Sequence, residues 1–354
     1  LMLKRSSILH RYPWLKRHRA VEYVVMGDDL DAALSTALFL HLHRNARLVG
    51  LYHKYDTVVY SGVSWQDVLG AVWLDLDIAH PACRSVGHHI VRHAPDDSLP
   101  NLAHSCNLNE LTDRSVRERF TEKYPLGTVH FLMWLYEVEF PSRPYADLLI
   151  WLADSAFING QSYKWHRQRR KTAGRHQWVR RKGFRWNVER WLQQEMPLRS
   201  LQETFEDVDT VDFERRMARF QREVMAQAGL SPGHGQVGSR HLKLSGYQCQ
   251  PNGDDIRAYV YRLLRFVCAQ TGWHVRLNQI APFERPRRAS GQREMLHIKA
   301  LDKTPLPAFL EQNEVFSYVF QSRRYLNYTH GMVPQESEAA RSDIISRNRA
   351  ASRG

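Results

Sequence analysis

The sequence predicts an α/β protein, in which a mostly parallel sheet is flanked by helices and followed by a smaller α+β domain. In the first half of the chain, short β-branched apolar runs alternate with longer helical patterns, an order typical of parallel sheets. Acidic residues follow several of these runs. The Gly/Pro-rich segment GLSPGHGQ at 229–236 indicates a domain boundary. The chain of 354 residues is long enough for two domains of ~100–200 residues each.

The first half begins with a strand and a helix joined by a glycine. The run VEYVVMG at 21–27 predicts a buried strand that ends at Gly27, and the small and apolar residues of 28–44 predict a helix. The other elements expected in this half are strands at 47–53 and 67–77, a short apolar segment at 85–93, and apolar helices at 124–140 and 145–157.

The second half changes character near residue 158. Residues 196–232 predict an amphipathic helix, and 253–272 predict a helix with an aspartate cap. Also expected are strands at 241–250, 273–280 and 294–303, a basic loop at 284–293 and a helix at 307–315. The patterns divide the chain into a basic N-terminal arm (1–19), an α/β domain (20–160), a basic and aromatic helical connector (161–235), an α+β domain (236–333) and a disordered polar tail (334–354).

The charge balance favours a polyanionic partner. Lys and Arg total 50 against 37 Asp and Glu, a formal net charge of +13, and such an excess attracts nucleic acid or acidic surfaces. A protein with a merely basic surface would show the same total. The four cysteines form no C-x-x-C pair, so neither a disulfide framework nor a zinc knuckle is expected. No signal-peptide pattern and no apolar run of membrane-spanning length are present, which predicts a cytoplasmic protein with no membrane partner.

Carboxylates and histidines gather after the predicted strands. Asp28, Asp29 and Asp31 follow the first strand. Hard divalent cations prefer carboxylate oxygens, whereas helix capping would account for one acid but not for three. Taken alone, these two interpretations are about equal. The other members are Asp75 and Asp77 after AVWL, the pair His88 and His89, and Asp154 in the apolar segment WLADSAF. An isolated carboxylate such as Asp154 requires a partner or a metal ion.

The order of these motifs resembles the DHH phosphoesterase superfamily. Its members include RecJ-type exonucleases, nanoRNases, cyclic-dinucleotide phosphodiesterases and family II pyrophosphatases. The resemblance covers roughly residues 21–160. It rests on DLDAALS (29–35), Asp75 after an apolar strand, GHH (87–89), NLN (107–109) and Asp154. Each motif is weak alone, but all occur in the family's order.

The resemblance implies a site for two divalent ions, Mn²⁺ or else Mg²⁺. Asp75 would bridge the ions, Asp29 would bind one of them, and the other would be held by Asp31, His88 and Asp154. His89 would lie behind the ligands or touch the phosphate, and Asp28 and Asp77 are additional candidates. With Asp75, His88 and His89 as catalytic residues, the reaction would be hydrolysis by a water that the two ions activate.

Two positions depart from the family pattern. Gly87 stands where the family has the aspartate that lies beside the metals and helps to orient the histidines. Val25 stands four residues before Asp29, where some members carry a histidine ligand, and Asp28 could substitute for it. The absence of an acid at Gly87 indicates either reduced activity or a relative that only binds nucleic acid, within a larger complex.

The connector has the composition of a single-strand binding groove. Residues 164–190 hold eleven Lys and Arg against one acid, with tryptophans interleaved, which suits phosphate tracking and base stacking. A solvated helix face with core tryptophans is the alternative interpretation. The candidate contacts are Lys164, Arg167, Arg169, Arg170, Lys171, Arg175, Trp178, Arg180, Arg181, Lys182, Arg185 and Trp186. In the second domain, Arg240, Arg285, Arg287 and Arg288 are candidate phosphate contacts, although surface arginines are the commoner case.

The sequence therefore predicts a metal-dependent nuclease or oligonucleotide phosphodiesterase that could act as a homodimer or within a complex. A DHH-type fold that binds nucleic acid without cleaving it is the first alternative. A small-molecule phosphatase or pyrophosphatase is the second, and the basic connector argues against it.

Overall fold

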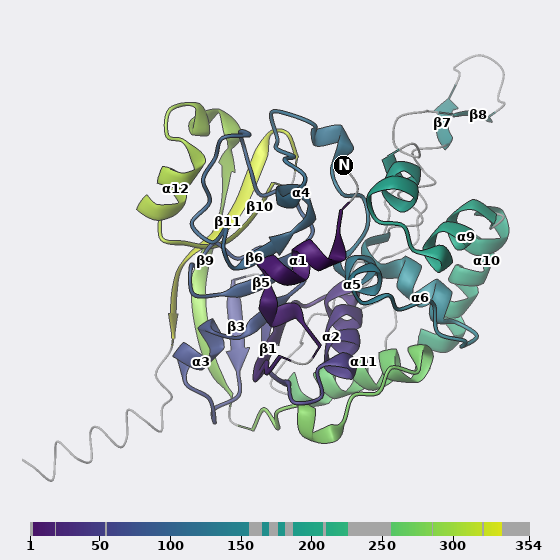
Figure 1. Ribbon diagram of the computed structural model, residues 1–354, viewed down its shortest axis with the longest axis horizontal. Coiled ribbons are helices and arrows are strands. Elements are labelled where there is room, and N and C mark those ends of the chain that lie inside the picture. Colours follow the sequence, from purple (N-terminus) through teal and green to yellow (C-terminus); the bar gives the residue numbers. More distant parts are fainter. Residues whose placement is uncertain are drawn as a thin grey trace, which may run out of the picture.

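The chain forms an α/β structure around one curved, mixed sheet of nine strands (Figure 1). The structure, a computed structural model, describes residues 3–17, 19–53, 55–155, 165–169, 176–180, 187–207, 210–225, 256–284, 286–320 and 322–334. The order of the strands in the sheet is β10-β11-β9-β3-β2-β1-β4-β5-β6. The predicted α/β class is confirmed.

Five adjacent strands of this sheet run parallel. They are β2 (Arg47–His53), β1 (Tyr23–Met26), β4 (Val72–Leu74), β5 (Arg84–Gly87) and β6 (Ser105–Asn107). Most of their residues are buried, and the apolar runs of the sequence located β1, β2 and β4. Strand β6 was not predicted, because SCN is too short to show a period.

The other four strands pair antiparallel and extend the same sheet. They are β3 (Asp56–Val59), β9 (Arg287–His297), β11 (Tyr325–Pro334) and β10 (Val315–Phe320). The predicted basic loop at 284–293 was wrong, since β9 begins at Arg287 and pairs with both β3 and β11. The predicted strand at 273–280 was also wrong, because a 3-10 helix, Leu277–Gln279, occupies it. A strand whose residues are mostly exposed and polar lacks the apolar pattern by which strands are predicted, so its sequence resembles that of a loop.

Helices pack on the parallel strands. The described α-helices are α1 (Arg5–Arg11), α2 (Leu30–Leu42), α3 (Trp65–Leu69), α4 (Leu108–Leu111), α5 (Thr128–Tyr136), α6 (Ala146–Leu152), α9 (Arg199–Asp207), α10 (Thr210–Phe220), α11 (Ile256–Thr271) and α12 (Leu306–Gln312). Helix α2 contacts α5 and α11, whereas α12 lies beside β10 at the far end of the sheet (Figure 1). Within the described residues, no helix is both long and apolar enough to cross a membrane.

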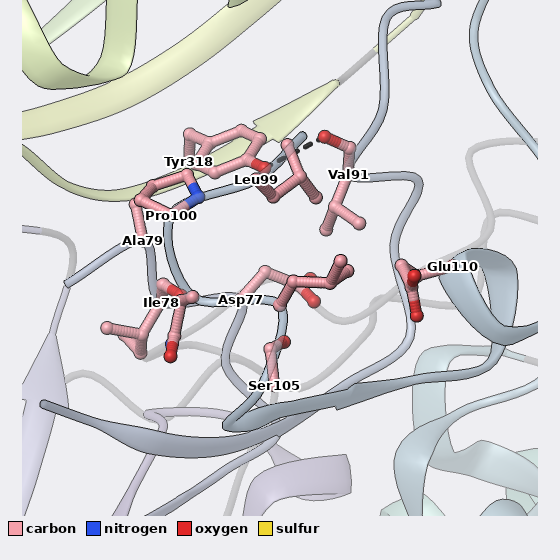
Figure 2. A pocket seen from close by; sticks show the side chains of 11 residues that line it. Asp77, Ile78, Ala79, Val91, Leu99, Pro100, Ser105, Glu110 and Tyr318 are labelled. Atoms are coloured by element: carbon pink, nitrogen blue, oxygen red, sulfur yellow. Dashed lines mark hydrogen bonds between the residues drawn. The ribbon is translucent and has the colours of Figure 1, made fainter. Parts of the chain in front are cut away.

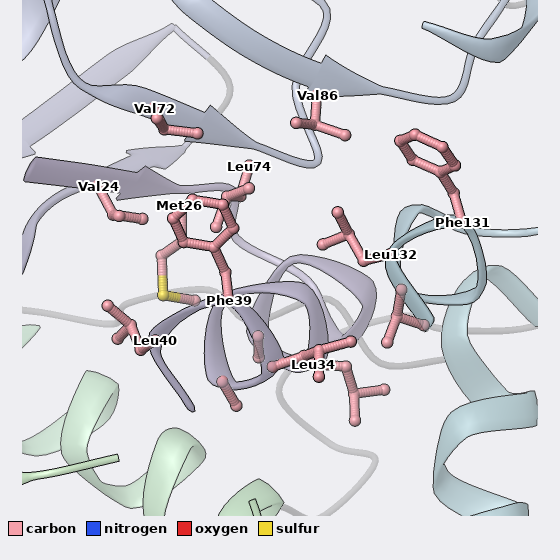
Figure 3. Packing of buried hydrophobic residues seen from close by; sticks show 14 of the residues in the cluster. Val24, Met26, Leu34, Phe39, Leu40, Val72, Leu74, Val86, Phe131 and Leu132 are labelled. Atoms are coloured by element: carbon pink, nitrogen blue, oxygen red, sulfur yellow. The ribbon is translucent and has the colours of Figure 1, made fainter. Parts of the chain in front are cut away.

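The main core lies between the parallel strands and helices α2 and α5. Figure 3 shows Met26 and Leu74 facing Leu34 and Phe39 of α2, with Leu132 of α5 close by. All five side chains are fully buried. This packing fixes the N-termini of α2 and α5 against the ends of the strands.

Several predicted regions lie outside the described residues. They are the boundary at 229–236, the strand at 241–250, most of the polar tail at 334–354 and the phosphate-contact candidates Arg240 and Arg285. In the connector, the two-stranded sheet of β7 (Trp165–Arg169) and β8 (His176–Arg180) is described. It carries the backbones of Arg167, Arg169, Trp178 and Arg180. The remaining candidates, Lys164, Arg170, Lys171, Arg175, Arg181, Lys182, Arg185 and Trp186, are outside.

Candidate metal centre

The predicted ligands meet at the carboxyl edge of the parallel strands. Strands β1, β4 and β5 are neighbours that run in the same direction, so the residues that follow them emerge together. Asp29 follows β1, Asp75 and Asp77 follow β4, and His88 and His89 follow β5. Asp154 reaches the same place from the 3-10 turn Ala153–Ser155 that follows α6.

Asp29 and Asp31 are held by two different helix N-termini. Asp29 is the N-cap of α2, and its carboxylate accepts the N–H of Ala32 at 2.9 Å. Asp31 is only 1% exposed and accepts the N–H groups of Thr128 at 2.5 Å and Val129 at 2.8 Å, at the start of α5. The positive end of a helix dipole stabilises a carboxylate. An aspartate that caps a helix can therefore also belong to the cluster of acids and histidines, so the two interpretations of these acids do not exclude each other.

Asp31 comes this close to α5 because residue 127 is a glycine. A Cβ atom on Gly127 would lie 2.3 Å from Oδ2 of Asp31, a severe overlap. The N–H of Gly127 is in turn donated to Nδ1 of the buried His130 at 3.1 Å. The backbone at the N-terminus of α5 is thus fixed on both sides.

Asp75 occupies a left-handed backbone conformation with a φ of 61°. Such a φ is uncommon for residues other than glycine, and residues of this kind cluster at functional sites. Its Oδ1 accepts the hydroxyl of Thr128 at 2.6 Å and lies 3.0 Å from Nδ1 of His88. Asp154 also has a positive φ, 50°. Two of the predicted metal ligands therefore share an unusual backbone.

His88 lies at the centre of the cluster and is 7% exposed. Its Nδ1 faces Asp75 and lies 3.8 Å from Oδ2 of Asp31, and its Nε2 contacts Oδ2 of Asp154. Two groups of side chains have donor atoms within 4.8 Å of one another: Asp31 with Asp75 and His88, and His88 with His89 and Asp154. His88 belongs to both groups.

The charges of this cluster perturb one another strongly. Burial, then repulsion from Asp154 and Asp31, raises the pKa of Asp29 to about 7. Burial and the charge of Asp29 raise the pKa of Asp75 to about 8, and burial with the charge of Asp75 raises that of Asp31 well above its usual range. Burial opposes ionisation of Asp154 too, but contact with His88 outweighs it and lowers the pKa of Asp154. Burial likewise opposes protonation of His88, yet Asp154 and Asp75 raise its pKa.

These donors suit hard or borderline divalent cations. Carboxylates and imidazole together are typical ligands of Mn²⁺, Zn²⁺ and Fe²⁺, and carboxylates alone suit Mg²⁺. The crowding that raises the pKa values of Asp29 and Asp75 would be offset by a cation among them. The residues present therefore fit a divalent metal, and the two close groups consist of Asp31, Asp75, His88, His89 and Asp154. The predicted ligand Asp29 belongs to neither group, although its charge raises the pKa of Asp75.

Two asparagines hold the histidine pair in place. The side-chain amide of Asn107 donates to the carbonyl of His89, and that of Asn109 donates to the carbonyl of His88, each at 2.8 Å. Both asparagines are fully buried. The sequence marked NLN as a motif but not as a support for the histidines. The only sequence signal for it was its place in the family's order of motifs.

Asp28 and Asp77 lie beside the cluster rather than in it. The carboxylate of Asp28 contacts Nδ1 of His53, at the end of β2. Asp77 contacts His89, with 2.9 Å between Oδ2 and Nδ1. Neither aspartate belongs to the two groups of close donor atoms within the described residues. His53 and Thr128 were not predicted, because a lone histidine or threonine carries no sequence signal of this kind.

Arg287 is not a free phosphate contact. It lies in β9, and its guanidinium donates to the carbonyl of Val63.

Comparison with protein-family models, curated proteins and solved structures found no match.

Proposed function

We propose that the chain is a divalent-metal-dependent phosphoesterase of the DHH type, which hydrolyses phosphodiesters of single-stranded nucleic acid or short oligonucleotides. The observation that carries the proposal is the position of His88, which is shared by two groups of close metal-ligating side chains. The two groups therefore lie side by side; a neutral imidazole would bind one ion, and a second ion beside it would depend on the carboxylates, with Asp75 as the bridge.

The cluster provides what a phosphoryl transfer needs from the protein. Bound there, divalent ions would supply Lewis acidity and generate a nucleophile from water near neutral pH. Asp31 and Asp75 are held by the start of α5, and His88 by Asn109, so the donors are fixed before any ligand arrives. Preorganised charge in a buried place is the principal source of electrostatic catalysis.

The charge of the chain indicates the class of substrate. A phosphodiester is an anion, and the chain carries a net charge of +13. The basic connector includes the antiparallel pair β7 and β8, with Arg167, Arg169 and Arg180 in its strands. Cations interleaved with aromatic residues favour a nucleic acid strand over a small phosphate ester.

The proposal predicts hydrolysis that depends on metal and on Asp75. End-labelled single-stranded DNA, RNA and a dinucleotide are incubated with Mn²⁺, or with Mg²⁺, beside an EDTA control. Asp75→Asn should reduce the rate by ~10²–10³-fold, the scale typical of losing a catalytic electrostatic group.

Asp113→Asn is the matched control. Asp113 also has a positive φ, 53°, but its side chain is 83% exposed and pairs with Arg92 rather than with a candidate ligand. Asparagine tolerates this backbone, so neither substitution strains the main chain, and thermal melts establish that both variants are folded. Full activity in Asp75→Asn would disprove the proposal. Salt-sensitive binding without cleavage of any substrate would favour the alternative, a protein that only binds nucleic acid.

A further inference from the structure

Gly87 is a glycine because another side chain fills the space beside it. Its backbone belongs to strand β5 and has no positive φ, so the conformation does not require glycine. A Cβ atom at this position would lie 1.9 Å from Oδ1 and 2.5 Å from Cγ of Asp77. Any larger residue at 87 would therefore displace the carboxylate of Asp77.

Asp77 is buried and bound entirely by neutral groups and one imidazole. Its side chain is 2% exposed. Oδ1 accepts the side-chain amide of Asn107 at 2.7 Å, while Oδ2 lies 2.9 Å from Nδ1 of His89 and 3.3 Å from its backbone nitrogen. A buried carboxylate requires such donors. Both of its oxygens are thus committed to holding residues 89 and 107.

The backbone of Asp77 is fixed from the opposite end of the sheet. Its carbonyl accepts the N–H of Tyr318 in β10 at 3.3 Å, and the next residue, Ile78, bridges to Ser317. Figure 2 shows Asp77 beside a small cavity with Glu110 and Tyr318, and Tyr318 is itself tied to Val91. From this backbone the carboxylate of Asp77 lies against Gly87 and His89.

We propose that Asp77 is the positioning residue for His89, and that Gly87 is present to admit it. By accepting a hydrogen bond from Nδ1–H, the carboxylate selects the tautomer whose Nε2 carries the free lone pair. A carboxylate behind an imidazole fixes ring orientation and raises basicity at a metal. His89 is 44% exposed on its side chain and belongs to the donor group with His88 and Asp154.

This inference deepens the proposed function and rests on it for the identity of the ligand. On this interpretation, the glycine in GHH does not indicate that the acidic partner of the histidines is lost. The carboxylate that the DHH pattern places at residue 87 is supplied here by residue 77, from the neighbouring strand. The histidine pair therefore keeps an acidic partner.

The first test uses the metal-free wild-type protein. Histidine nitrogens are labelled with ¹⁵N, His89 is assigned by comparison with His89→Gln, and the tautomer is determined from nitrogen chemical shifts in EDTA. The expected result is a proton on Nδ1 of His89. A proton on Nε2 alone would overturn the proposal, whatever the protein's metal affinity.

The second test moves the carboxylate. Asp77→Gly combined with Gly87→Asp returns an acid to the same space from the other strand, whereas Asp77→Gly combined with Gly87→Ala fills part of it without an acid. Both double variants remove the clash seen for a side chain at 87, and thermal melts establish that each is folded. Calorimetry measures the affinity for Mn²⁺, and the tautomer of His89 is determined for each.

The first double variant should recover the Nδ1–H tautomer and Mn²⁺ affinity to within ~10-fold of wild type, and the second should remain ~10–100-fold weaker, the range for losing a partner behind a ligand. Equal behaviour of the two would show that Asp77 only fills space, and would overturn the inference. If the wild type binds no Mn²⁺, the proposed function fails, while the tautomers still decide the role of Asp77.

Discussion

The two halves of the sheet differ in what they bury. In the parallel half, all three residues of β4 are buried and the strand delivers Asp75 and Asp77 into the interior. In the antiparallel half, Ala289 is the one buried residue of β9, and arginines occupy several of its other positions. Charge is therefore solvated in one half and crowded in the other. Crowded, desolvated charges perturb one another strongly, and groups perturbed in this way cluster at functional sites.

The halves are nevertheless joined at the candidate site. Strand β10 of the antiparallel half hydrogen-bonds the segment that follows β4. The half that carries no predicted ligand thus positions Asp77.

The largest expected effect on stability comes from the core of the parallel half. Leu132 of α5 is fully buried beside β4 and β5 (Figure 3). Leu132→Ala should reduce the free energy of unfolding by about 2–5 kcal/mol, through lost burial and the cavity that remains. Urea denaturation followed by circular dichroism measures it. A loss below about 1 kcal/mol would mean that α5 is not packed as described.

Gly127→Ala should weaken metal binding more than it weakens the fold. The new methyl group would overlap Oδ2 of Asp31, so the carboxylate must leave the N-terminus of α5. We expect Mn²⁺ affinity to fall ~10–100-fold, as for other disturbed ligand supports. Gly70→Ala is the matched control, because a Cβ there meets only ordinary contacts from 3.4 Å. If Gly127→Ala and Gly70→Ala bind Mn²⁺ with equal affinity, Asp31 takes no part in metal binding.

Metal affinity should rise with pH through neutrality. The pKa values of about 7 for Asp29 and about 8 for Asp75 mean that protons compete with a cation in this range. For each proton that the cation displaces, the affinity rises about tenfold per pH unit as long as the pH is below the pKa of that carboxyl. Calorimetry at pH 6, 7 and 8 in buffers of different ionisation enthalpy measures both the affinity and the proton release. A pH-independent affinity would contradict the crowding of these carboxylates.

The same pKa values determine the pH dependence of stability without metal. Both carboxyls have folded pKa values above the unfolded value of about 3.9. Their contribution to stability is complete below about pH 4 and is lost as the pH rises through 7 and 8. Thermal melts in EDTA should therefore show a falling melting temperature between pH 5 and pH 8.5, and Mn²⁺ should restore it. A rise instead would show that other groups dominate.

The smallest effect is expected on the exposed face of β9. Met295 is 61% exposed, so Met295→Ala should change the free energy of unfolding by less than about 0.5 kcal/mol and leave Mn²⁺ affinity unchanged. Urea denaturation and calorimetry check both. A loss comparable to that of Leu132→Ala would mean that this face is covered by another part of the protein.

The sequence predicted the parallel half well because its signals are local. Continuous apolar runs located β1, β2 and β4, and among the acids and histidines that follow strands, Asp75 and His88 lie close together in the structure. The antiparallel half was predicted poorly, because β9 is mostly exposed and basic and its sequence therefore resembles that of a loop. Its place beside β3 depends on pairing across more than 200 residues, for which a single sequence gives no period.

The supports of the site escaped sequence analysis for a related reason. Gly87 was interpreted as a lost acid, whereas the structure places Asp77 against it. Thr128, Asn107 and Asn109 act through hydrogen bonds to the candidate ligands. Such contacts follow from tertiary packing, and no spacing in the sequence encodes them.

The most direct test of the central claim is calorimetric titration of the EDTA-treated protein with Mn²⁺ at pH 7.5, for wild type, Asp75→Asn and Asp113→Asn. The account predicts saturable binding of two ions by wild type and Asp113→Asn, and loss of at least one ion or ~100-fold weaker binding in Asp75→Asn. Absence of saturable binding in wild type, or identical binding in all three proteins, would contradict a metal centre at the carboxyl edge of the parallel strands.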